Sequence, residues 1–252
     1  MKTLQRSLIF KDVAGRDDRL TMRLKKMAER FNISASTIRN YEAKGLIPPA
    51  ERSPNGYRVY TELHAAYLSC IQAMAQPFGM EVTAEALRCL HQNKPQNAMW
   101  IIREKEIALY EEKEKLERLF EDIRAYSNEN KSLYADEPFT INEASELTQI
   151  PKSAIRYWDQ AGYVMADRDP TNRYRRYSGS HLLKIRLIQM LQSSVYSEDT
   201  VNIRQSIGAV EHTDLEGLVN VAENIRAYLD KILEAQMCGI ANLYELIQFT
   251  KD

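Results

Sequence analysis

The chain has 252 residues, enough for two domains with cores of their own, and 27% of its residues are charged. No apolar run approaches the length of a membrane span, which argues against an integral membrane protein. The net charge of −1 argues against nucleic-acid binding over the whole surface, but the charge is uneven. Residues 23–60 hold eight Lys and Arg against three Asp and Glu, whereas residues 209–252 hold three against eight.

Residues 1–22 mix apolar and charged side chains without a clear period, and we expect a flexible arm. Their apolar run is too short for a secretion signal, and acidic residues follow it too soon. Three widely separated cysteines, Cys70, Cys89 and Cys238, are typical of reduced thiols. Together these features favour a cytoplasmic protein.

Two short helices and a hairpin are predicted after the arm. Residues 24–31 place apolar side chains on one helix face, and Ser34 is a suitable N-cap for a second helix over residues 35–44. Pro48 and Pro49 cannot continue that helix, and Ser-Pro-Asn-Gly then separates two short extended runs. Two helices joined by a tight turn and followed by a hairpin are typical of a winged helix-turn-helix.

This module occurs a second time. With the numbering shifted by 117, residues 150–177 fall on residues 33–60 without a gap. Trp158 stands where the first copy has Tyr41, so an aromatic ring is kept there. The first-copy residues that recur unchanged are Ile38, Arg39, Gly45, Asn55, Tyr57, Arg58 and Tyr60.

Further helices are predicted after each copy. Residues 62–76 and 83–90 have helical apolar spacing, with Thr61 and Thr83 as caps. Residues 97–126 contain no Gly or Pro and carry a narrow apolar stripe among Glu and Lys, which indicates a long coiled-coil helix.

A second apolar seam is predicted over residues 215–233, and we expect Gly239 to end that helix. Residues 240–249 are strongly apolar and are expected to pack back on another part of the chain. The predicted fold class is mainly α, with two winged helix-turn-helix domains that carry small hairpin wings, each followed by a long pairing helix. The predicted parts are an arm (1–22), a first winged-helix domain (23–94), a coiled-coil helix (95–127), a linker (128–138), a second winged-helix domain (139–208) and a C-terminal coiled-coil helix with a tail (209–252).

Both copies resemble the DNA-binding domain of the MerR family of bacterial transcription regulators. The first copy has STIRNYEAKGLIPP and RSPNGYRVY, which follow the family pattern closely except at Asn40, where the family usually has Tyr. The second copy keeps SAIRYWDQAGY and NRYRRY, but has Met165 and Ala166 in place of the two prolines and Arg173 in place of the wing glycine. The second module therefore has a different wing turn and recognises a different DNA sequence, or it has lost sequence-specific recognition of DNA.

The resemblance implies which residues contact DNA, because arginines neutralise phosphates and hydroxyls donate to the backbone. Ile38 and Tyr60 are expected in the core instead, whereas phosphate contact is favoured over solvated surface for Arg39 and Arg58. The first-copy site residues are Ser36, Thr37, Arg39, Asn40, Tyr41, Arg52, Tyr57 and Arg58. The second-copy site residues are Ser153, Arg156, Tyr157, Trp158, Arg173, Tyr174, Arg175 and Arg176.

The resemblance further implies a transcription regulator that binds double-stranded promoter DNA, distorts it and acts with RNA polymerase, on the nucleoid in the bacterial cytoplasm. We expect no enzyme, because the four histidines are scattered and no phosphate-binding glycine loop or nucleophile arrangement is present. We expect no metal or other cofactor, because residues 97–126 contain no Cys. A small-molecule effector is left open, in a pocket lined by aromatic rings that are more simply explained as core. These rings are Trp100, Tyr110, Phe120, Tyr228 and Tyr244.

Two other function classes stay open: a drug- or metabolite-binding protein on a MerR-like scaffold, and an architectural DNA-binding protein. The assembly is open as well. The two pairing helices can pair within one chain as a monomeric pseudo-dimer, because a helix of about 30 residues is roughly 45 Å long and the linker extends to about 35 Å. A homodimer would instead carry four winged helices. The pseudo-dimer is slightly favoured.

Overall fold

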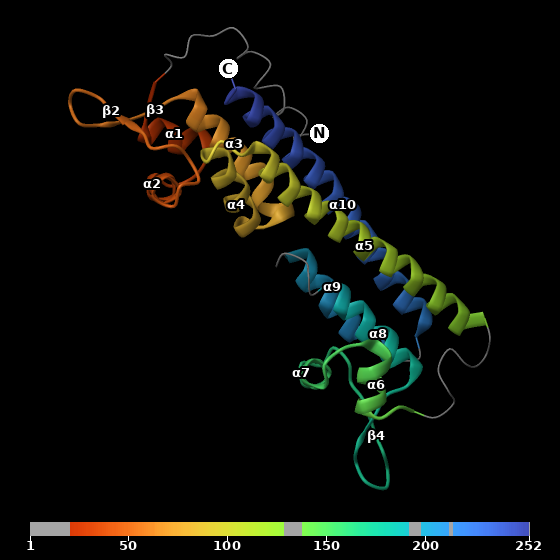
Figure 1. The fold of residues 1–252 in the computed structure, drawn as a ribbon. Helices are drawn as coiled ribbons and strands as arrows, with labels where there is room; N and C mark the ends of the chain where they lie inside the picture. Colours follow the sequence, from red (N-terminus) through yellow and green to blue (C-terminus); the bar gives the residue numbers. More distant parts are fainter. Residues whose placement is uncertain (1–20, 129–137, 192–197, 212–213, 252) are drawn as a thin grey trace. The chain divides into compact units, whose positions relative to one another are not determined.

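The computed structural model describes residues 21–128, 138–191, 198–211 and 214–251, and Figure 1 shows its helices and strands. The chain divides into two compact units. Unit 1 comprises residues 1–103 and 235–252, and unit 2 comprises residues 104–234. The predicted arm and linker fall almost wholly outside the described residues. None of the described helices combines the length and the apolar composition that crossing a membrane requires.

Unit 1 begins with a helix-turn-helix and a small sheet. Helix α1 (Leu24–Phe31) turns into α2 (Ala35–Ala43) through Asn32, whose φ of 51° is left-handed, and Ser34 Oγ accepts from the Thr37 N–H to cap α2. The wing strands β2 (Glu51–Arg52) and β3 (Arg58–Tyr60) pair antiparallel. A further strand, β1 (Met22–Arg23), pairs with the other edge of β3. Met22 was assigned to the arm, which was wrong, because a two-residue strand has no sequence period of its own.

Two further helices follow the wing in unit 1. Helix α3 (Glu62–Phe78) begins with a capping box in which Thr61 N–H donates to His64 Nδ1 at 3.0 Å. Helix α4 (Met80–His91) follows directly. The prediction that Thr83 caps α4 was wrong. The N-cap is Gly79, and Thr83 lies in the first turn of the helix. Its side chain is buried, and its hydroxyl donates to the Gly79 carbonyl at 2.8 Å.

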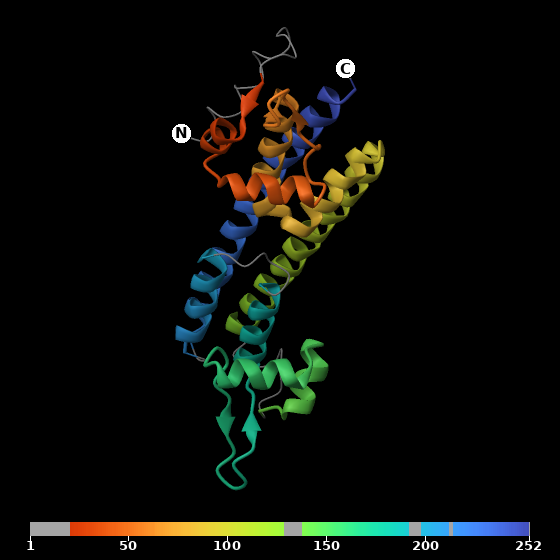
Figure 2. The ribbon, with the colours of Figure 1, turned by 90° about the vertical axis from the view of Figure 1, so that its left-hand side faces the viewer.

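The C-terminal part of helix α10 (Leu215–Phe249) closes the core of unit 1. Figures 1 and 2 both show this part of α10 alongside α3. The predicted break at Gly239 was wrong, since α10 runs through it. A Cβ at Gly239 would lie 3.0 Å from Phe78 Cε2 and 3.3 Å from the Ala73 carbonyl oxygen, so the missing side chain allows close helix packing. The α10 residues in the core are Leu243, Leu246 and Ile247, as predicted for this apolar segment.

Unit 2 repeats the winged helix with a two-stranded wing. Figure 2 shows the hairpin of the wing, β4 and β5. Thr140 and Glu143 form a capping box at the start of its first helix. Ala144 of this helix is buried in the core, whereas Leu147 is 43% exposed. The elements of unit 2 are α6 (Ile141–Thr148), α7 (Lys152–Gln160), β4 (Asp167–Arg168), β5 (Arg175–Arg176), α8 (Gly179–Met190) and α9 (Glu198–Ala209).

The long helix α5 (Pro95–Asn128) contributes its C-terminal half to the core of unit 2. There, Arg226 of α10 lies 4.1 Å from the Phe120 ring and 3.1 Å from Glu117 Oε2. Arg186 of α8 forms an ion pair of 2.6 Å with Asp122. Apolar packing, a cation–π contact and ion pairs therefore join α5 to α8 and α10 within this unit. The buried α5 residues are Leu116, Leu119, Phe120 and Ile123.

Candidate nucleic-acid interface

A carboxylate near the end of the second helix holds the wing of unit 1. Glu42 Oε2 accepts from Arg58 Nε at 3.1 Å and from the Tyr60 hydroxyl at 3.4 Å, and its Oε1 accepts from the Ala50 N–H at 3.2 Å. Tyr60 is buried, and burial followed by the nearby Glu42 charge raises the pKa of its hydroxyl. Glu42 therefore sets the orientation of β3 relative to α2.

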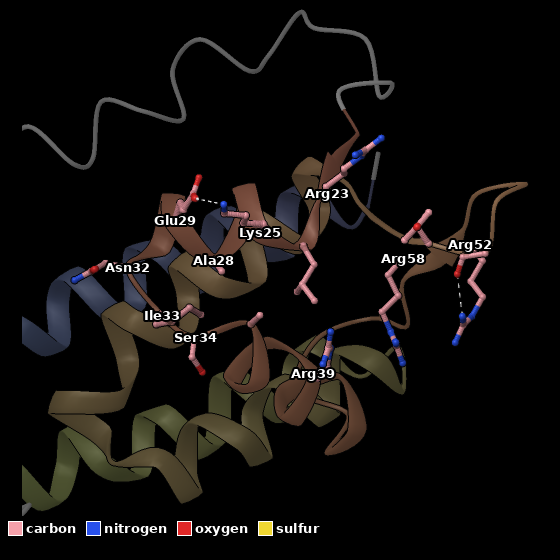
Figure 3. Close-up of a pocket in the computed structure, with 14 residues that line it drawn as sticks. Arg23, Lys25, Ala28, Glu29, Asn32, Ile33, Ser34, Arg39, Arg52 and Arg58 are labelled. Carbon is pink, nitrogen blue, oxygen red and sulfur yellow. Dashed lines mark hydrogen bonds and ion pairs between the residues drawn. The ribbon is translucent and has the colours of Figure 1, made fainter.

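A concavity of about 810 Å³ lies between α1, the start of α2 and the wing of unit 1. Figure 3 shows the side chains that line it, with Arg39 from α2, Arg52 and Arg58 from the wing and Arg23 from β1. Five of the lining side chains are cationic, and Glu29 is the acid among them. A hollow of this composition suits a polyanion such as a sugar–phosphate backbone. The five cations are Arg23, Lys25, Arg39, Arg52 and Arg58.

Of the predicted first-copy residues, Arg39, Arg52, Tyr57 and Arg58 line this concavity. The other four lie on α2, where Ser36 and Asn40 are exposed and Thr37 and Tyr41 are half-buried. Two cationic lining residues were not predicted from the sequence, Arg23 and Lys25. The basic run at residues 23–26 was visible in the charge count, but nothing in it predicted that α1 faces the wing.

Unit 2 repeats the carboxylate clamp. Arg175 Nε donates to Asp159 Oδ2 at 2.6 Å, and the Ala166 N–H donates to Asp159 Oδ1 at 3.1 Å. Arg168 approaches the same carboxylate at 3.6 Å. Because Ala166 takes the place of Ala50, the two copies do not align without a gap through the wing.

The register of the repeat shifts by one residue before the wing turn and returns after it. Ser53 N–H donates to the Tyr57 carbonyl at 2.9 Å, and its counterpart is the bond from Asp169 N–H to the Tyr174 carbonyl at 2.9 Å. The second copy lacks one residue ahead of β4 and has one more in the turn. The ungapped alignment was therefore wrong within the wing, and Arg168 rather than Asp169 is the counterpart of Arg52.

Asp169 stabilises the longer turn. Its carboxylate accepts from the backbone N–H of Thr171 at 2.9 Å and of Asn172 at 3.2 Å, and from Arg176 at 3.0 Å. These donors, the two backbone N–H groups first, lower the pKa of Asp169. Arg173 has a φ of 64°, close to the 78° of Gly56, so it occupies the left-handed position of the wing glycine.

The remaining second-copy residues divide between surface and core. Arg156, Tyr157 and Tyr174 are exposed, as are Ser153 and Arg173. The half-buried Arg175 and Arg176 are each held by a carboxylate. Trp158 is only 4% exposed and packs in the core of unit 2, so we remove it from the interface.

Two family profiles match the chain, one in each unit. Residues 23–60 match the profile described as MerR family regulatory protein, and residues 139–202 match the profile described as MerR HTH family regulatory protein. The HTH-type transcriptional regulator CueR of Escherichia coli O157:H7 is 30% identical over 109 residues, which are 43% of this chain and 77% of that protein. The chain belongs to the MerR family.

Other relatives support the same membership in the MerR family. The mercuric resistance operon regulatory protein of Bacillus cereus is 27% identical over 121 residues, which are 46% of this chain and 92% of that protein. The HTH-type transcriptional regulator AdhR of Bacillus subtilis is 38% identical over 53 residues, 21% of this chain and 38% of that protein. No solved structure matches the chain. Each of these relatives aligns with less than half of the chain, which carries two MerR domains in tandem.

Proposed function

We propose that this chain, a DNA-binding regulator of the MerR family, regulates transcription by gripping promoter DNA with both winged helices and distorting it. The observation that carries the proposal is the concavity of unit 1, which five cationic side chains from β1, α1, the recognition helix α2 and the wing line together. In both units a carboxylate clamp holds the wing against the recognition helix. Relatives of the chain are named as transcriptional regulators. We propose no enzymatic activity.

Distortion of the duplex requires many backbone contacts, because bending a binding site costs several kcal/mol. The exposed wing tyrosines Tyr57 and Tyr174, at 70% and 73% exposure, can add hydroxyl donors to the arginines. Arg58 uses its Nε for Glu42, and its remaining guanidinium N–H groups are proposed for phosphate. In this proposal the protein acts in the cytoplasm on chromosomal DNA, together with RNA polymerase.

We also propose that one chain forms a pseudo-dimer. In unit 2 the C-terminal half of α5 packs with the N-terminal half of α10, through Phe120, Glu117 and Arg226. In unit 1 the opposite ends of the same helices, represented by Ile102 and Leu246, share a core. Antiparallel pairing of α5 with α10 inside one chain supplies the contacts that a dimer of shorter regulators would draw from two chains.

The proposed DNA contact is tested with Arg39→Ala and Arg52→Ala on a promoter duplex and on a duplex of unrelated sequence. Each variant should bind both duplexes more weakly, and log K should fall less steeply with log salt, by about 0.9 for each lost phosphate contact. Lys44→Ala is the matched control, because Lys44 is exposed at the end of α2 but does not line the concavity. If both arginine variants bind like the wild type, the concavity of unit 1 is not the DNA-binding site.

The proposed pseudo-dimer is tested by sedimentation of the full chain at micromolar concentration. A mass near the 29.2 kDa of one chain is expected. If the main species has twice that mass, the pseudo-dimer is contradicted and the protein is a homodimer carrying four winged helices. Genome-wide mapping of bound DNA then gives the site and its symmetry, and binding without preference for promoters would favour an architectural protein.

A further inference from the structure

The two winged helices differ on the side of the concavity that faces the first helix. In unit 1, Arg23 and Lys25 line this side. Their counterparts are set by the pairing of the strand before the helix: Met22 lies opposite Tyr60, as Phe139 lies opposite Tyr177. Thr140 and Asn142 therefore stand in unit 2 where unit 1 has two cations.

Thr140 is also committed to a local role. Its N–H donates to Glu143 Oε2 at 2.7 Å, and the Glu143 N–H donates to Thr140 Oγ1 at 3.4 Å. The hydrogen bond from the Thr140 N–H, followed by one from the Thr140 side chain, lowers the pKa of Glu143, so its carboxylate stays ionised. Unit 1 has Lys26 at the equivalent position, and Arg23 makes no side-chain cap on α1. The first turn of α6 is therefore less positive than that of α1.

The wing of unit 2 compensates for this difference only in part. Arg173 adds one cation where unit 1 has Gly56. Arg175 is engaged by Asp159, which also draws in Arg168 at 3.6 Å, and Arg176 is engaged by Asp169. In unit 1, Arg58 is likewise held by Glu42, and Lys25 lies 4.0 Å from Glu29 in a largely exposed pair, but Arg52 donates to the Gly56 carbonyl, a neutral acceptor. A cation already neutralised by a carboxylate releases fewer counterions when a phosphate arrives.

We propose that the two halves hold the DNA backbone unequally, because Arg23 and Lys25 form a phosphate contact on the α1 side of unit 1 that unit 2 lacks. This inference rests on the proposed function and ranks the two units by the strength of their contacts with the DNA backbone. Unit 1 is the stronger anchor, and unit 2 holds the duplex through α7 and its wing alone. The DNA site of one chain then has one tightly held half and one loosely held half.

The test grafts the residues of unit 2 onto unit 1 in the double variant Arg23→Thr, Lys25→Asn. The probe is a fluorescein-labelled duplex of mixed sequence, because phosphate contacts do not depend on sequence. The slope of log K against log salt should become shallower by about 0.9 for each of the two lost contacts. Arg23 pairs with Val59 through its backbone, which the substitution leaves in place, and threonine is a good N-cap. The double variant is therefore expected to fold.

Two further variants complete the test. Lys26→Asn is the control, because it removes one positive charge from α1 outside the concavity, and its slope should match the wild type. Asn142→Lys restores a cation in unit 2 and should steepen the slope by about 0.9. A double variant no shallower than Lys26→Asn overturns the inference while the proposed function stands. A wild-type chain that binds no duplex at low salt overturns the proposed function itself.

Discussion

Arg58 donates from Nε to Oε2 of Glu42, 3.1 Å away, and this bond joins the wing of unit 1 to its recognition helix. The equivalent bond in unit 2 runs from Arg175 to Asp159 at 2.6 Å. The wing arginine is thus a positioning group as well as a candidate phosphate ligand. Its replacement tests both roles together, so the clamp needs an experiment of its own.

We predict a measurable coupling between the two members of this clamp. A double-mutant cycle with Glu42→Gln and Arg58→Lys should give a coupling energy of about 0.5–1 kcal/mol in urea unfolding, because the pair is only partly exposed. The control cycle uses Lys25 and Glu29, which are 4.0 Å apart and largely exposed, and should give about 0–0.3 kcal/mol. Equal coupling in the two cycles would contradict a positioning role for Glu42.

Replacement of Arg173 by asparagine should stabilise the fold but weaken DNA binding. Its φ of 64° is costly for a long side chain, whereas asparagine tolerates this conformation. Arg173→Asn is therefore expected to raise the free energy of unfolding by up to about 1 kcal/mol, while the loss of its charge weakens DNA binding. Thermal unfolding and a salt titration of duplex binding measure the two effects. A variant that is less stable and binds as tightly as the wild type would contradict both expectations.

Gly239 should not tolerate a branched side chain. Phe78 and the Ala73 carbonyl already lie within 3.3 Å of the position of a Cβ, so Gly239→Val is expected to lower the free energy of unfolding by at least about 1–3 kcal/mol. Ala241→Val is the control, because Ala241 is exposed on the same helix and loses only helix propensity, about 0.5 kcal/mol. Similar losses in the two variants would mean that α3 and α10 are not closely packed there.

The stability of unit 1 should fall in mild acid. Burial lowers the pKa of His64, although the nearby Glu42 charge opposes the shift. The unfolded chain therefore takes up a proton near pH 6.5 that the folded chain resists. The contribution of neutral His64 is fully present above that pH and is lost as the pH falls from there through the lower pKa of the folded state.

Urea unfolding between pH 5 and 8 measures this dependence in the wild type and in His64→Gln. Glutamine keeps a capping-box acceptor for the Thr61 N–H but does not titrate. His91, whose pKa burial also lowers, keeps part of the dependence, so the variant should show a weaker slope rather than none. An unchanged slope would mean that His64 does not contribute.

Much of the fold followed from local patterns in the sequence. The apolar period, Ser34 as a cap and the turn residues of the wing predicted α1, α2 and the first hairpin because neighbouring residues determine those features. The failures depend on distant partners. Gly239 looked like a helix break because the sequence does not show that Phe78 packs against it. Trp158 looked like a ligand of DNA because the pattern cannot tell an inward ring from an outward one.

The candidate site was predictable in the same measure. Arg39 and Arg58 were found because they recur at fixed spacing in both copies, and Arg52 because it stands in the wing motif of the family. Arg23 and Lys25 were missed because their place depends on how α1 meets the wing, which no local period encodes. The one-residue slip in the second wing was hidden because a deletion and an insertion cancel between Tyr163 and Tyr177.

The position of helix α10 has a consequence for how the protein is made. Leu246 belongs to the core of unit 1, although the rest of that unit is encoded at the other end of the chain. On the ribosome, the apolar core of the first winged helix is closed only after all of the second winged helix and nearly the whole chain have been synthesised. Contacts of such long sequence separation slow folding, and the waiting half exposes apolar surface to chaperones in the meantime.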